Sequence, residues 1–336
     1  MRIKRYCHRV QLSRLVSLAV AGVVAAAGVT GCAAAASTTG QGAAGHGQPP
    51  AAGQGAASSP SARAAEHGFQ PAHEASGPSR VKAKAAALVD VDTDQLLWSR
   101  GLNRELPMGS ITKVMTALLV IKAGDLDRQI RIPHAVLNYV AKYQGESAGL
   151  RPGDVLTPHE LLQALLIESG CDAAYVLATT YGPGIPAFLA KMNAMAAQLG
   201  MTQTHFTSPD GLPYPTEHST YSTPADLLKL GVAAMKLAVF RSIVDQTFYH
   251  LRKTKKHHSY WWDNTNSLIG NYPGADGIKT GYTDAAKHCL LFEAMRHGTT
   301  LIGVVLGSPV TGPFAADQAA ARMLNWGFSR KLAAGH

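Results

Sequence analysis

The sequence predicts an α/β domain in which strands from both ends of the domain form one antiparallel sheet around a helical insertion. Short apolar runs typical of strands lie at residues 85–99 and again at 277–306. Between them, apolar side chains recur at helical spacing and helix capping signals are present. The sheet should therefore be closed by strands that are distant in the sequence.

The elements follow in order along the chain. Ala85–Val91 and Gln95–Ser99 flank Asp92-Thr93-Asp94 and predict a hairpin. Helices are predicted at Ile111–Ile121, which Gly124 ends, and at Thr157–Glu168, Asp172–Thr180, Ile185–Leu199 and Thr223–Met235. Strands are predicted at Gly277–Thr283, His288–Met295 and Thr300–Leu306, with a turn at Arg296-His297-Gly298 and a final helix at Ala315–Phe328.

The N-terminus resembles a secretory signal. Five Lys and Arg residues and no acids stand in the first fourteen positions, and an apolar run follows from Leu15 to Val29. The run is shorter than the ~20 residues that a membrane-spanning helix needs. We therefore expect residues 1–31 to be a signal peptide, with a transmembrane helix as the alternative.

The end of this segment resembles a lipobox, the cleavage signal of bacterial lipoproteins. It reads Val29-Thr30-Gly31-Cys32, and the resemblance implies that Cys32 becomes a lipidated mature N-terminus. Lipid would hold the protein at the outer face of the cell membrane, and ordinary secretion is the alternative. Residues 32–79 are rich in Ala, Gly, Ser, Gln and Pro and predict a disordered tether, which leaves 80–333 as the domain.

Charge and cysteine content limit the classes of function that fit this chain. Subtracting the five signal cations from the net charge of +9 leaves about +4, which gives no indication of nucleic-acid binding. Cys171 and Cys289 remain in the domain, and we expect free thiols although a disulfide between them stays open. The fourteen His residues show no metal-ligand spacing, so we expect no metal and no cofactor.

Three short motifs stand in a fixed order and supply the parts of an acyl-transfer site. They are Ser110-Ile-Thr-Lys113, Ser169-Gly170-Cys171 and Lys279-Thr280-Gly281. None is specific alone, and a solvated helix surface or turn is the ordinary explanation of each. The evidence for an acyl-transfer site is their order and their predicted structural contexts.

The first motif places a nucleophile beside a base. A spacing of three puts Ser110 and Lys113 on one helix face, with Ser110 at the helix start, where backbone N–H groups favour negative charge. A serine hydroxyl needs a base, and a lysine serves only when it is neutral. Lys279 is a second cation that, together with burial, would lower the pKa of Lys113.

The third motif lies on a predicted strand, where alternation places Lys279 and Gly281 on one face. Gly281 would let a substrate backbone approach closely. The N–H of Tyr282, with that of Ser110, could form an oxyanion hole.

Together these residues resemble the low-molecular-mass penicillin-binding proteins, which are serine-type D-alanyl-D-alanine carboxypeptidases and transpeptidases. The resemblance extends over residues 84–306 and includes Pro152-Gly153-Asp154, Asp210-Gly211-Leu212 and Asn264-Thr265-Asn266. It implies a β-lactamase-like fold with a five-stranded antiparallel sheet, helices on its faces and an all-helical subdomain.

The resemblance also assigns roles. Ser110 would be acylated by a peptidoglycan stem peptide ending in D-Ala-D-Ala or by a β-lactam, and Lys113 would act as base. Ser169 would relay a proton to the leaving group, while Lys279 and Thr280 would bind the substrate carboxylate.

Two positions depart from the family pattern. Cys171 stands where the family usually has Asn in Ser-x-Asn, and a thiol is a weak replacement for an amide in contact with substrate or Lys113. Thr265 stands where carboxypeptidases of the family often have Arg, which removes a cation from carboxylate recognition.

Two other functions remain open at this stage. A class A β-lactamase shares the fold, but no Glu-x-x-Leu-Asn segment lies between Ser169 and Lys279. A non-catalytic envelope binding protein is the second alternative, and the intact Ser110 and Lys113 argue against it. Finally, the basic run at residues 253–258 is expected to be a solvated hairpin tip rather than an anion site.

Overall fold

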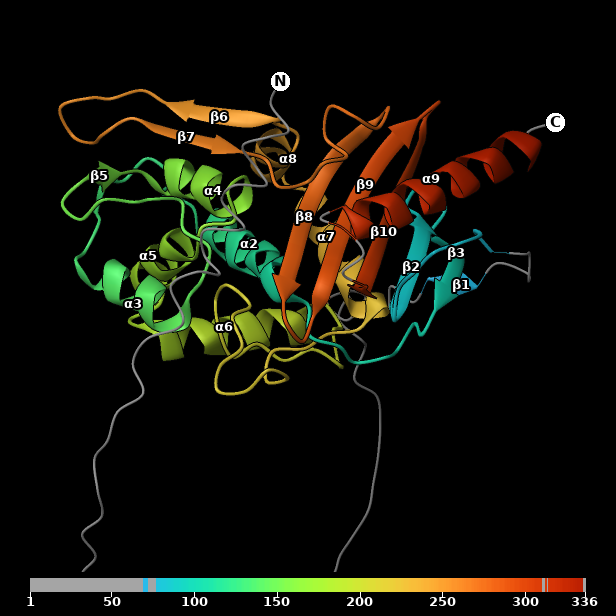
Figure 1. Cartoon of the computed structure of the whole chain (residues 1–336), viewed down its shortest axis with the longest axis horizontal. Helices are drawn as coiled ribbons and strands as arrows, with labels where there is room; N and C mark the ends of the chain where they lie inside the picture. The colour runs from blue at the N-terminus through green and yellow to red at the C-terminus, as the bar shows by residue number, and fades with distance from the viewer. Residues whose placement is uncertain (1–68, 72–76, 310–311, 313, 335–336) are drawn as a thin grey trace, which may run out of the picture. The chain divides into compact units, whose positions relative to one another are not determined.

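The computed structural model describes residues 69–71, 77–309, 312 and 314–334 (Figure 1). Contacts divide the chain into Met1–Ser59 and Pro60–His336, and every element below belongs to the second unit. The predicted signal peptide and Cys32 lie outside the described residues, as does most of the predicted tether. In the part of the chain that the structure describes, no helix has the length and apolar character needed to cross a membrane.

The centre of the fold is a sheet with the order β1-β3-β2-β10-β9-β8. Its five long strands are antiparallel: β2 (Ala85–Asp90), β3 (Gln95–Arg100), β8 (Ala275–Thr283), β9 (Lys287–Arg296) and β10 (Thr299–Ser308). The N-terminal strand β2 pairs with the C-terminal strand β10, from Leu301 opposite Asp90 to Leu306 opposite Ala85. The sheet is therefore assembled from both ends of the domain, as the sequence predicts.

One edge carries an addition that the sequence does not predict. β1 (Gln70–Pro71) pairs with β3 in parallel, Gln70 opposite Gln95, and Phe69 packs against the core. These residues lie within the segment 32–79 that we expected to be a tether, so its C-terminal end takes part in the fold.

The two faces of the sheet bury two separate cores because side chains alternate along each strand. Helix α9 (Ala315–Ala334) covers one face and packs on Leu88, Phe292 and Val305 (Figure 1). The opposite face carries Val89, Leu291 and Val304, which pack against the helical region.

The helical region lies between β3 and β8. It contains the 3-10 turn η2 (Gly109–Thr112) and the helices α2 (Lys113–Ala123), α3 (Ala135–Tyr143), α4 (Pro158–Leu166), α5 (Cys171–Tyr181), α6 (Ile185–Gln198), α7 (Pro224–Met235) and α8 (Ala238–Val244). Two small ribbons complete it: β4 (Ile130–Arg131) with β5 (Val155–Leu156), and β6 (Phe248–Leu251) with β7 (Tyr260–Asp263).

Helix starts follow the capping residues read from the sequence. Thr157 caps α4 in a full capping box with Glu160, and the Thr223 hydroxyl accepts from the Asp226 N–H at the start of α7. Gly124, at φ 76°, ends α2. The sequence does not predict α3 and α8, which are short and lack a capping side chain.

Candidate active site

The nucleophile candidate lies on the turn that leads into α2. Ser110 belongs to η2 and Lys113 is the first residue of α2, with Lys113 Nζ 2.7 Å from Ser110 Oγ. Lys113 has no exposed surface. Its Nζ also contacts the Asp210 carbonyl oxygen at 3.2 Å and Cys171 Sγ at 3.4 Å. The predicted pairing of hydroxyl and amine on one helix face is therefore present, away from solvent.

Two other backbone segments, the loop at Gly211 and strand β8, pack against this turn at glycines. Gly109 has φ 56°, and a side chain there would meet the Tyr282 backbone nitrogen at 2.8 Å. A side chain at Gly211 would collide with the Gly109 carbonyl oxygen, and one at Gly281 with the Met108 carbonyl oxygen. We name Gly109, Gly211 and Gly281 the glycine contacts. Gly281 makes room for the protein's own backbone, which differs from our expectation that it makes room for substrate.

The same packing brings together the two predicted oxyanion-hole residues. A Cβ at Gly281 would lie 3.2 Å from the Ser110 backbone nitrogen, while the neighbouring Tyr282 nitrogen adjoins Gly109. Strand β8 and the turn η2 are thus in direct backbone contact where Ser110 lies. The assignment of the two N–H groups to an oxyanion stays a prediction.

A second cationic centre lies on β8. Lys279 is 1% exposed, and its Nζ lies 3.2 Å from Thr280 Oγ1 and 3.4 Å from Thr265 Oγ1. The two hydroxyls bond to each other at 2.6 Å. Burial, and secondarily the charge of Lys113, lower the pKa of Lys279 to about 7. The lowering of the Lys113 pKa that the sequence analysis expected stays a prediction.

The Asn-x-Asn segment positions Thr265. Asn264 donates to the carbonyl oxygens of Val244 and Gln246, and Asn266 donates to that of Gly277. The two amides thus tie the segment to the end of α8 and to β8. Thr265 between them reaches Thr280 and Lys279, at the position where we noted the absence of an Arg.

The second motif lies at the start of α5. Ser169 is 6% exposed with φ 67°, and Gly170 is the N-cap. The preceding Glu168 and the loop residue Glu146 both act on Lys279, since their charges oppose the lowering of its pKa. The Ile167 carbonyl oxygen, two residues before Ser169, accepts from the Thr265 N–H at 3.2 Å, so the motif begins beside the Lys279 centre.

Cys171 is buried in the site. It is 1% exposed, and its backbone N–H donates to the Glu146 carbonyl oxygen at 2.8 Å. Gly145 lies so close that a side chain there would meet Cys171 Sγ at 2.8 Å. Burial raises the pKa of the Cys171 thiol to about 12. Cys171 and Cys289 are both free, as we expected.

Two groups that the sequence analysis missed support the site. The Asp172 carboxylate accepts from Ala148 N and Leu150 N at 3.0 Å and from the Ser147 hydroxyl at 2.7 Å, which fixes the loop beside Cys171. Tyr139 donates to Asp210 Oδ2 at 2.8 Å, next to the carbonyl oxygen that Lys113 contacts. An acid directly after Ser-Gly-Cys was the only available signal for Asp172.

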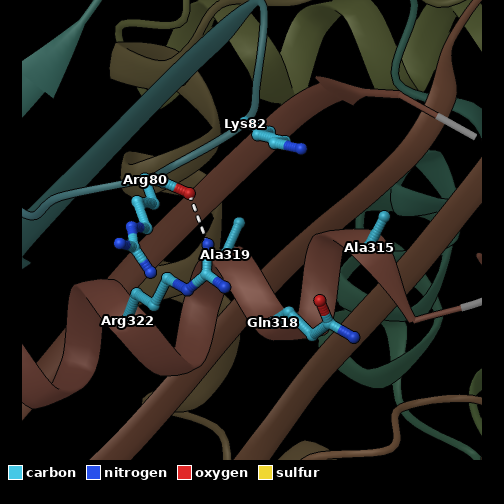
Figure 2. A pocket seen from close by; sticks show the side chains of 6 residues that line it. All are labelled: Arg80, Lys82, Ala315, Gln318, Ala319 and Arg322. Carbon is cyan, nitrogen blue, oxygen red and sulfur yellow. Dashed lines mark hydrogen bonds between the residues drawn. The ribbon is translucent and has the colours of Figure 1, made fainter. Parts of the chain in front are cut away.

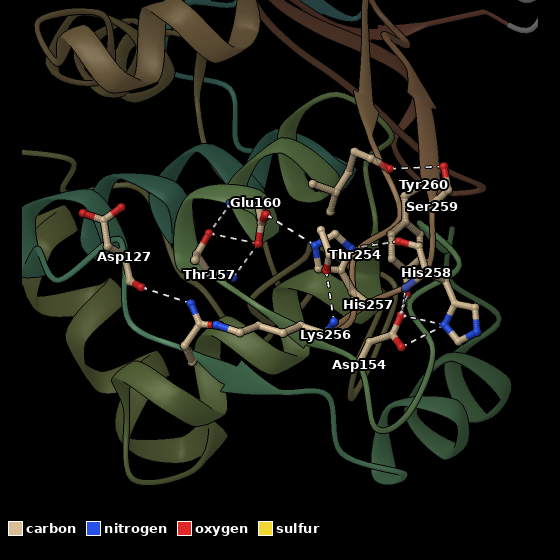
Figure 3. A network of polar contacts seen from close by, with 12 residues as sticks. Asp127, Asp154, Thr157, Glu160, Thr254, Lys256, His257, His258, Ser259 and Tyr260 are labelled. Atoms are coloured by element: carbon tan, nitrogen blue, oxygen red, sulfur yellow. Dashed lines mark hydrogen bonds and ion pairs between the residues drawn. The ribbon is translucent and has the colours of Figure 1, made fainter.

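The basic run of the sequence is only partly solvated. It does lie at the tip of the β6–β7 hairpin, but His257 is buried 3.9 Å from Glu160, and His258 Nδ1 lies 2.8 Å from Asp154 Oδ1. Figure 3 shows these contacts. The two His residues hold the hairpin against its neighbours. His258 remains exposed, and the expectation of a solvated loop was wrong for the buried His257.

A small pocket lies apart from all three motifs. It has a volume of about 70 Å³ and is lined by Arg80, Lys82 and four residues of α9: Ala315, Gln318, Ala319 and Arg322 (Figure 2). The Arg322 guanidinium donates to the Arg80 carbonyl oxygen at 2.6 Å. No residue of the motifs lines it. Among the described residues, no group of three His, Cys, Asp or Glu side chains could hold a metal ion.

Comparison with known proteins agrees with this geometry. The family model of D-alanyl-D-alanine carboxypeptidases, peptidase family S11, matches residues 71–310. A D-alanyl-D-alanine carboxypeptidase of Streptomyces sp. strain K15 is 37% identical over 274 residues, 78% of this chain and 92% of the relative. One from Mycobacterium tuberculosis is 37% identical over 251 residues, 74% of this chain and 82% of the relative.

Solved structures agree as well. The crystal structure of the Streptomyces K15 DD-transpeptidase superposes with a TM-score of 0.71 at 37% identity, covering 76% of this chain and all of that one. A putative penicillin-binding protein homologue from Mycobacterium tuberculosis gives 0.69 at 35% identity, covering 77% and 96%. The expected fold, with five antiparallel strands and flanking helices, is confirmed. The chain belongs to the D-alanyl-D-alanine carboxypeptidase family of serine peptidases.

Proposed function

We propose that this chain releases the terminal D-Ala of peptidoglycan stem peptides and passes the remaining acyl group, through an acyl-Ser110 intermediate, to water or to an acceptor amine. We also propose that β-lactams acylate the same serine. The observation that carries the proposal is the 2.7 Å contact between Ser110 Oγ and a fully buried Lys113 Nζ. A lysine amine held against a serine hydroxyl and away from water has the geometry of a general base.

In the proposed reaction, Ser110 Oγ attacks the carbonyl carbon of the penultimate D-Ala and its proton passes to the Lys113 amine. The backbone N–H groups of Ser110 and Tyr282 stabilise the negative charge on the carbonyl oxygen. The C–N bond then breaks, and the leaving D-Ala amine takes a proton that reaches it through Ser169. Water or an acceptor amine subsequently attacks the acyl-Ser110 ester and regenerates the hydroxyl.

The substrate carboxylate is assigned to the second centre. Lys279, Thr280 and Thr265 present an ammonium group and two hydroxyls within 3.4 Å of one another. A bound carboxylate would favour the charged form of Lys279 and offset the burial that lowers its pKa. Recognition of a free C-terminal carboxylate is what a carboxypeptidase requires.

Intact mass after penicillin treatment tests this function. One penicilloyl adduct is expected on the wild-type chain and none on Ser110→Ala, with Ser219→Ala as a matched control on an exposed loop. An adduct that survives Ser110→Ala contradicts the assignment. A β-lactamase would release the adduct within the assay, whereas a DD-peptidase retains it. Products from a D-Ala-D-Ala tripeptide, with and without an acceptor amine, separate hydrolysis from transfer.

We also propose that Cys32 carries the lipid that places the domain at the outer face of the cell membrane. The support is the sequence Val29-Thr30-Gly31-Cys32 after a basic start and an apolar run. Metabolic labelling with a fatty-acid analogue is expected to mark the wild-type chain and not Cys32→Ser. Equal labelling of both contradicts the proposal.

A further inference from the structure

The β6–β7 hairpin carries three aromatic rings on its outer face. The rings of Phe248 and Trp261 stack with centroids 4.7 Å apart and planes at 8°, and His250 lies 5.1 Å from Trp261. Phe248 is 44% and Trp261 51% exposed. We name Phe248, His250 and Trp261 the aromatic platform. Large exposed aromatic groups gathered on one face indicate an interaction site.

Burial of the hairpin does not require this platform. Side chains alternate along both strands, and the inner face carries Leu251, Tyr260 and Trp262, which are already buried in the core. The outer face of such a ribbon is ordinarily polar. Stacking across the two strands stabilises the hairpin itself by about 0.2–1 kcal/mol, but a smaller pair would serve that purpose without exposing an indole.

The hairpin is held in a fixed orientation. Its tip is fastened by the contacts of His257 with Glu160 and of His258 with Asp154, and the Tyr260 hydroxyl also donates to Asp154 (Figure 3). The Val155 N–H of β5 donates to the Lys256 carbonyl oxygen at 3.0 Å. A surface held in this way is preorganised, so a ligand loses less free energy in ordering it.

Strand β7 leads from the platform directly into the candidate active site. The Asp263 N–H donates to Glu168, the neighbour of Ser169, and Thr265 follows two residues later. Trp261 and Thr265 are four positions apart in the chain, which is at most about 13 Å when extended. An extended peptidoglycan stem of about five residues spans roughly 17 Å. The platform therefore lies within the reach of the sugar to which such a stem is attached.

We propose that the aromatic platform binds the glycan strand of peptidoglycan, an inference that rests on the proposed function. The C–H faces of N-acetyl amino sugars pack on the negative faces of aromatic rings. Exposed cations follow at the hairpin tip, Arg252, Lys253 and Lys255, and complement the carboxylates of stem peptides. The chemistry fits an acetylated amino-sugar polymer with acidic peptides attached.

Two measurements on the full chain test the platform. The first is binding of an N-acetylglucosamine oligomer, which carries no peptide, followed by tryptophan fluorescence and calorimetry. The second is the ratio of kcat/KM for glycan-linked stem peptide to kcat/KM for a soluble D-Ala-D-Ala tripeptide. Trp261→Ala and Phe248→Ala are expected to weaken oligomer binding and to lower this ratio by about 3- to 10-fold.

Controls and contradicting outcomes are as follows. Met295→Ala, which truncates a 55% exposed side chain on β9, is expected to change neither quantity. Trp261→Phe keeps a ring and should retain most of the binding, which separates loss of the platform from loss of the fold. An unchanged ratio and unchanged oligomer binding in Trp261→Ala overturn the proposal. So does a concentration-dependent dimer that Trp261→Ala abolishes, since the occupant would then be a second copy.

The outcomes also separate this proposal from the proposed function. Oligomer binding without penicillin acylation would leave the platform standing and contradict the acyl-Ser110 assignment. Acylation of Ser110 without oligomer binding would support the acyl-Ser110 assignment and contradict the role of the platform.

Discussion

Lys113 Nζ and Cys171 Sγ lie 3.4 Å apart, and both side chains are buried. The resemblance described in the sequence analysis implies an Asn at this position, and this chain has a thiol beside the candidate base instead. A thiol makes only weak hydrogen bonds, which leaves Lys113 held chiefly by Ser110 and the Asp210 carbonyl oxygen.

Cys171→Asn is expected to raise the second-order rate of penicillin acylation about three- to tenfold, the equivalent of one hydrogen bond of 0.5–1.5 kcal/mol. The larger side chain presses on Gly145 and should lower the free energy of unfolding by about 1–3 kcal/mol. Acylation kinetics and denaturant unfolding measure the two effects. Cys171→Ala is the control that removes the thiol without adding an amide. Identical acylation rates in all three proteins would show that Cys171 acts only in packing.

Thiol reagents should modify Cys171 slowly in the folded protein. Burial raises its pKa to about 12, and the thiolate is the reactive form. We expect the rate with a soluble disulfide reagent to be below about a hundredth of the rate in denaturant. Rapid modification of the folded wild-type chain would indicate that the loop around Gly145 opens.

Lys279 should make stability depend on pH. The unfolded chain binds a proton at this group below about 10.5, and the folded chain only below about 7. Between these values the unfolded state binds more protons, so the free energy of unfolding rises with pH across this window. Lys279→Met is expected to remove that rise, measured by denaturant unfolding at about pH 7 and about pH 9. Lys82→Met, at an exposed site, should keep it.

The ionisation of Lys279 should also affect activity, which is expected to fall as the pH rises. Only the charged form of Lys279 attracts a substrate carboxylate, and that form is lost from the free enzyme above a pH of about 7. The kcat/KM for a D-Ala-D-Ala peptide is therefore expected to fall by up to about tenfold per pH unit above this value. A profile that is flat from neutral to alkaline pH would contradict the assignment of Lys279 to the carboxylate.

Thr265→Val should weaken carboxylate recognition. It removes the 2.6 Å hydrogen bond to Thr280 and a contact with Lys279. We expect a three- to tenfold lower kcat/KM, about 0.5–1.5 kcal/mol, with kcat changed less than KM. Thr216→Val, which breaks a hydroxyl pair with Ser219 on an exposed loop, is the matched control. An equal effect in both variants would mean that general destabilisation is responsible.

Gly281→Ala should slow acylation of Ser110 although it leaves the serine itself unchanged. The added methyl group collides with the Met108 carbonyl oxygen and displaces the turn that carries Ser110. A displacement of about 1 Å can reduce the rate by roughly 100-fold. Gly312→Ala, where a methyl group meets open space, is expected to acylate normally. Normal acylation of Gly281→Ala would show that the turn tolerates displacement.

Much of the fold could be predicted because its signals are local. Thr157 and Thr223 each cap a helix by a hydrogen bond to a residue three positions later. The residues Arg296-His297-Gly298 predict the turn between β9 and β10. Helix α3, the strand β1 and the glycine contacts could not be predicted in the same way. They depend on tertiary contacts, and a glycine in a sequence does not reveal which distant backbone it will meet.

In the candidate site, too, the features set by local sequence could be predicted and those set by tertiary packing could not. The spacing of Ser110 and Lys113 predicts their 2.7 Å contact because a single helical turn decides it. The lowered pKa of Lys279 could not be predicted, since burial of Lys279 arises from packing between β8 and the helical region. The supporting roles of Tyr139 and Asp172 could not be predicted either. Tyr139 bonds to Asp210, which is remote in the sequence, and Asp172 bonds to the backbone of a loop.

The glycine contacts join segments about a hundred residues or more apart in the chain, and so bear on when the chain acquires reactivity. The turn with Ser110 is complete only after Gly211 and the C-terminal strand β8 have come to rest against it. Contacts of such high sequence separation form late and slowly. A chain whose C-terminal strands have not yet docked would therefore carry an inert serine. Labelling by penicillin would consequently report completed folding, and could be used to time it.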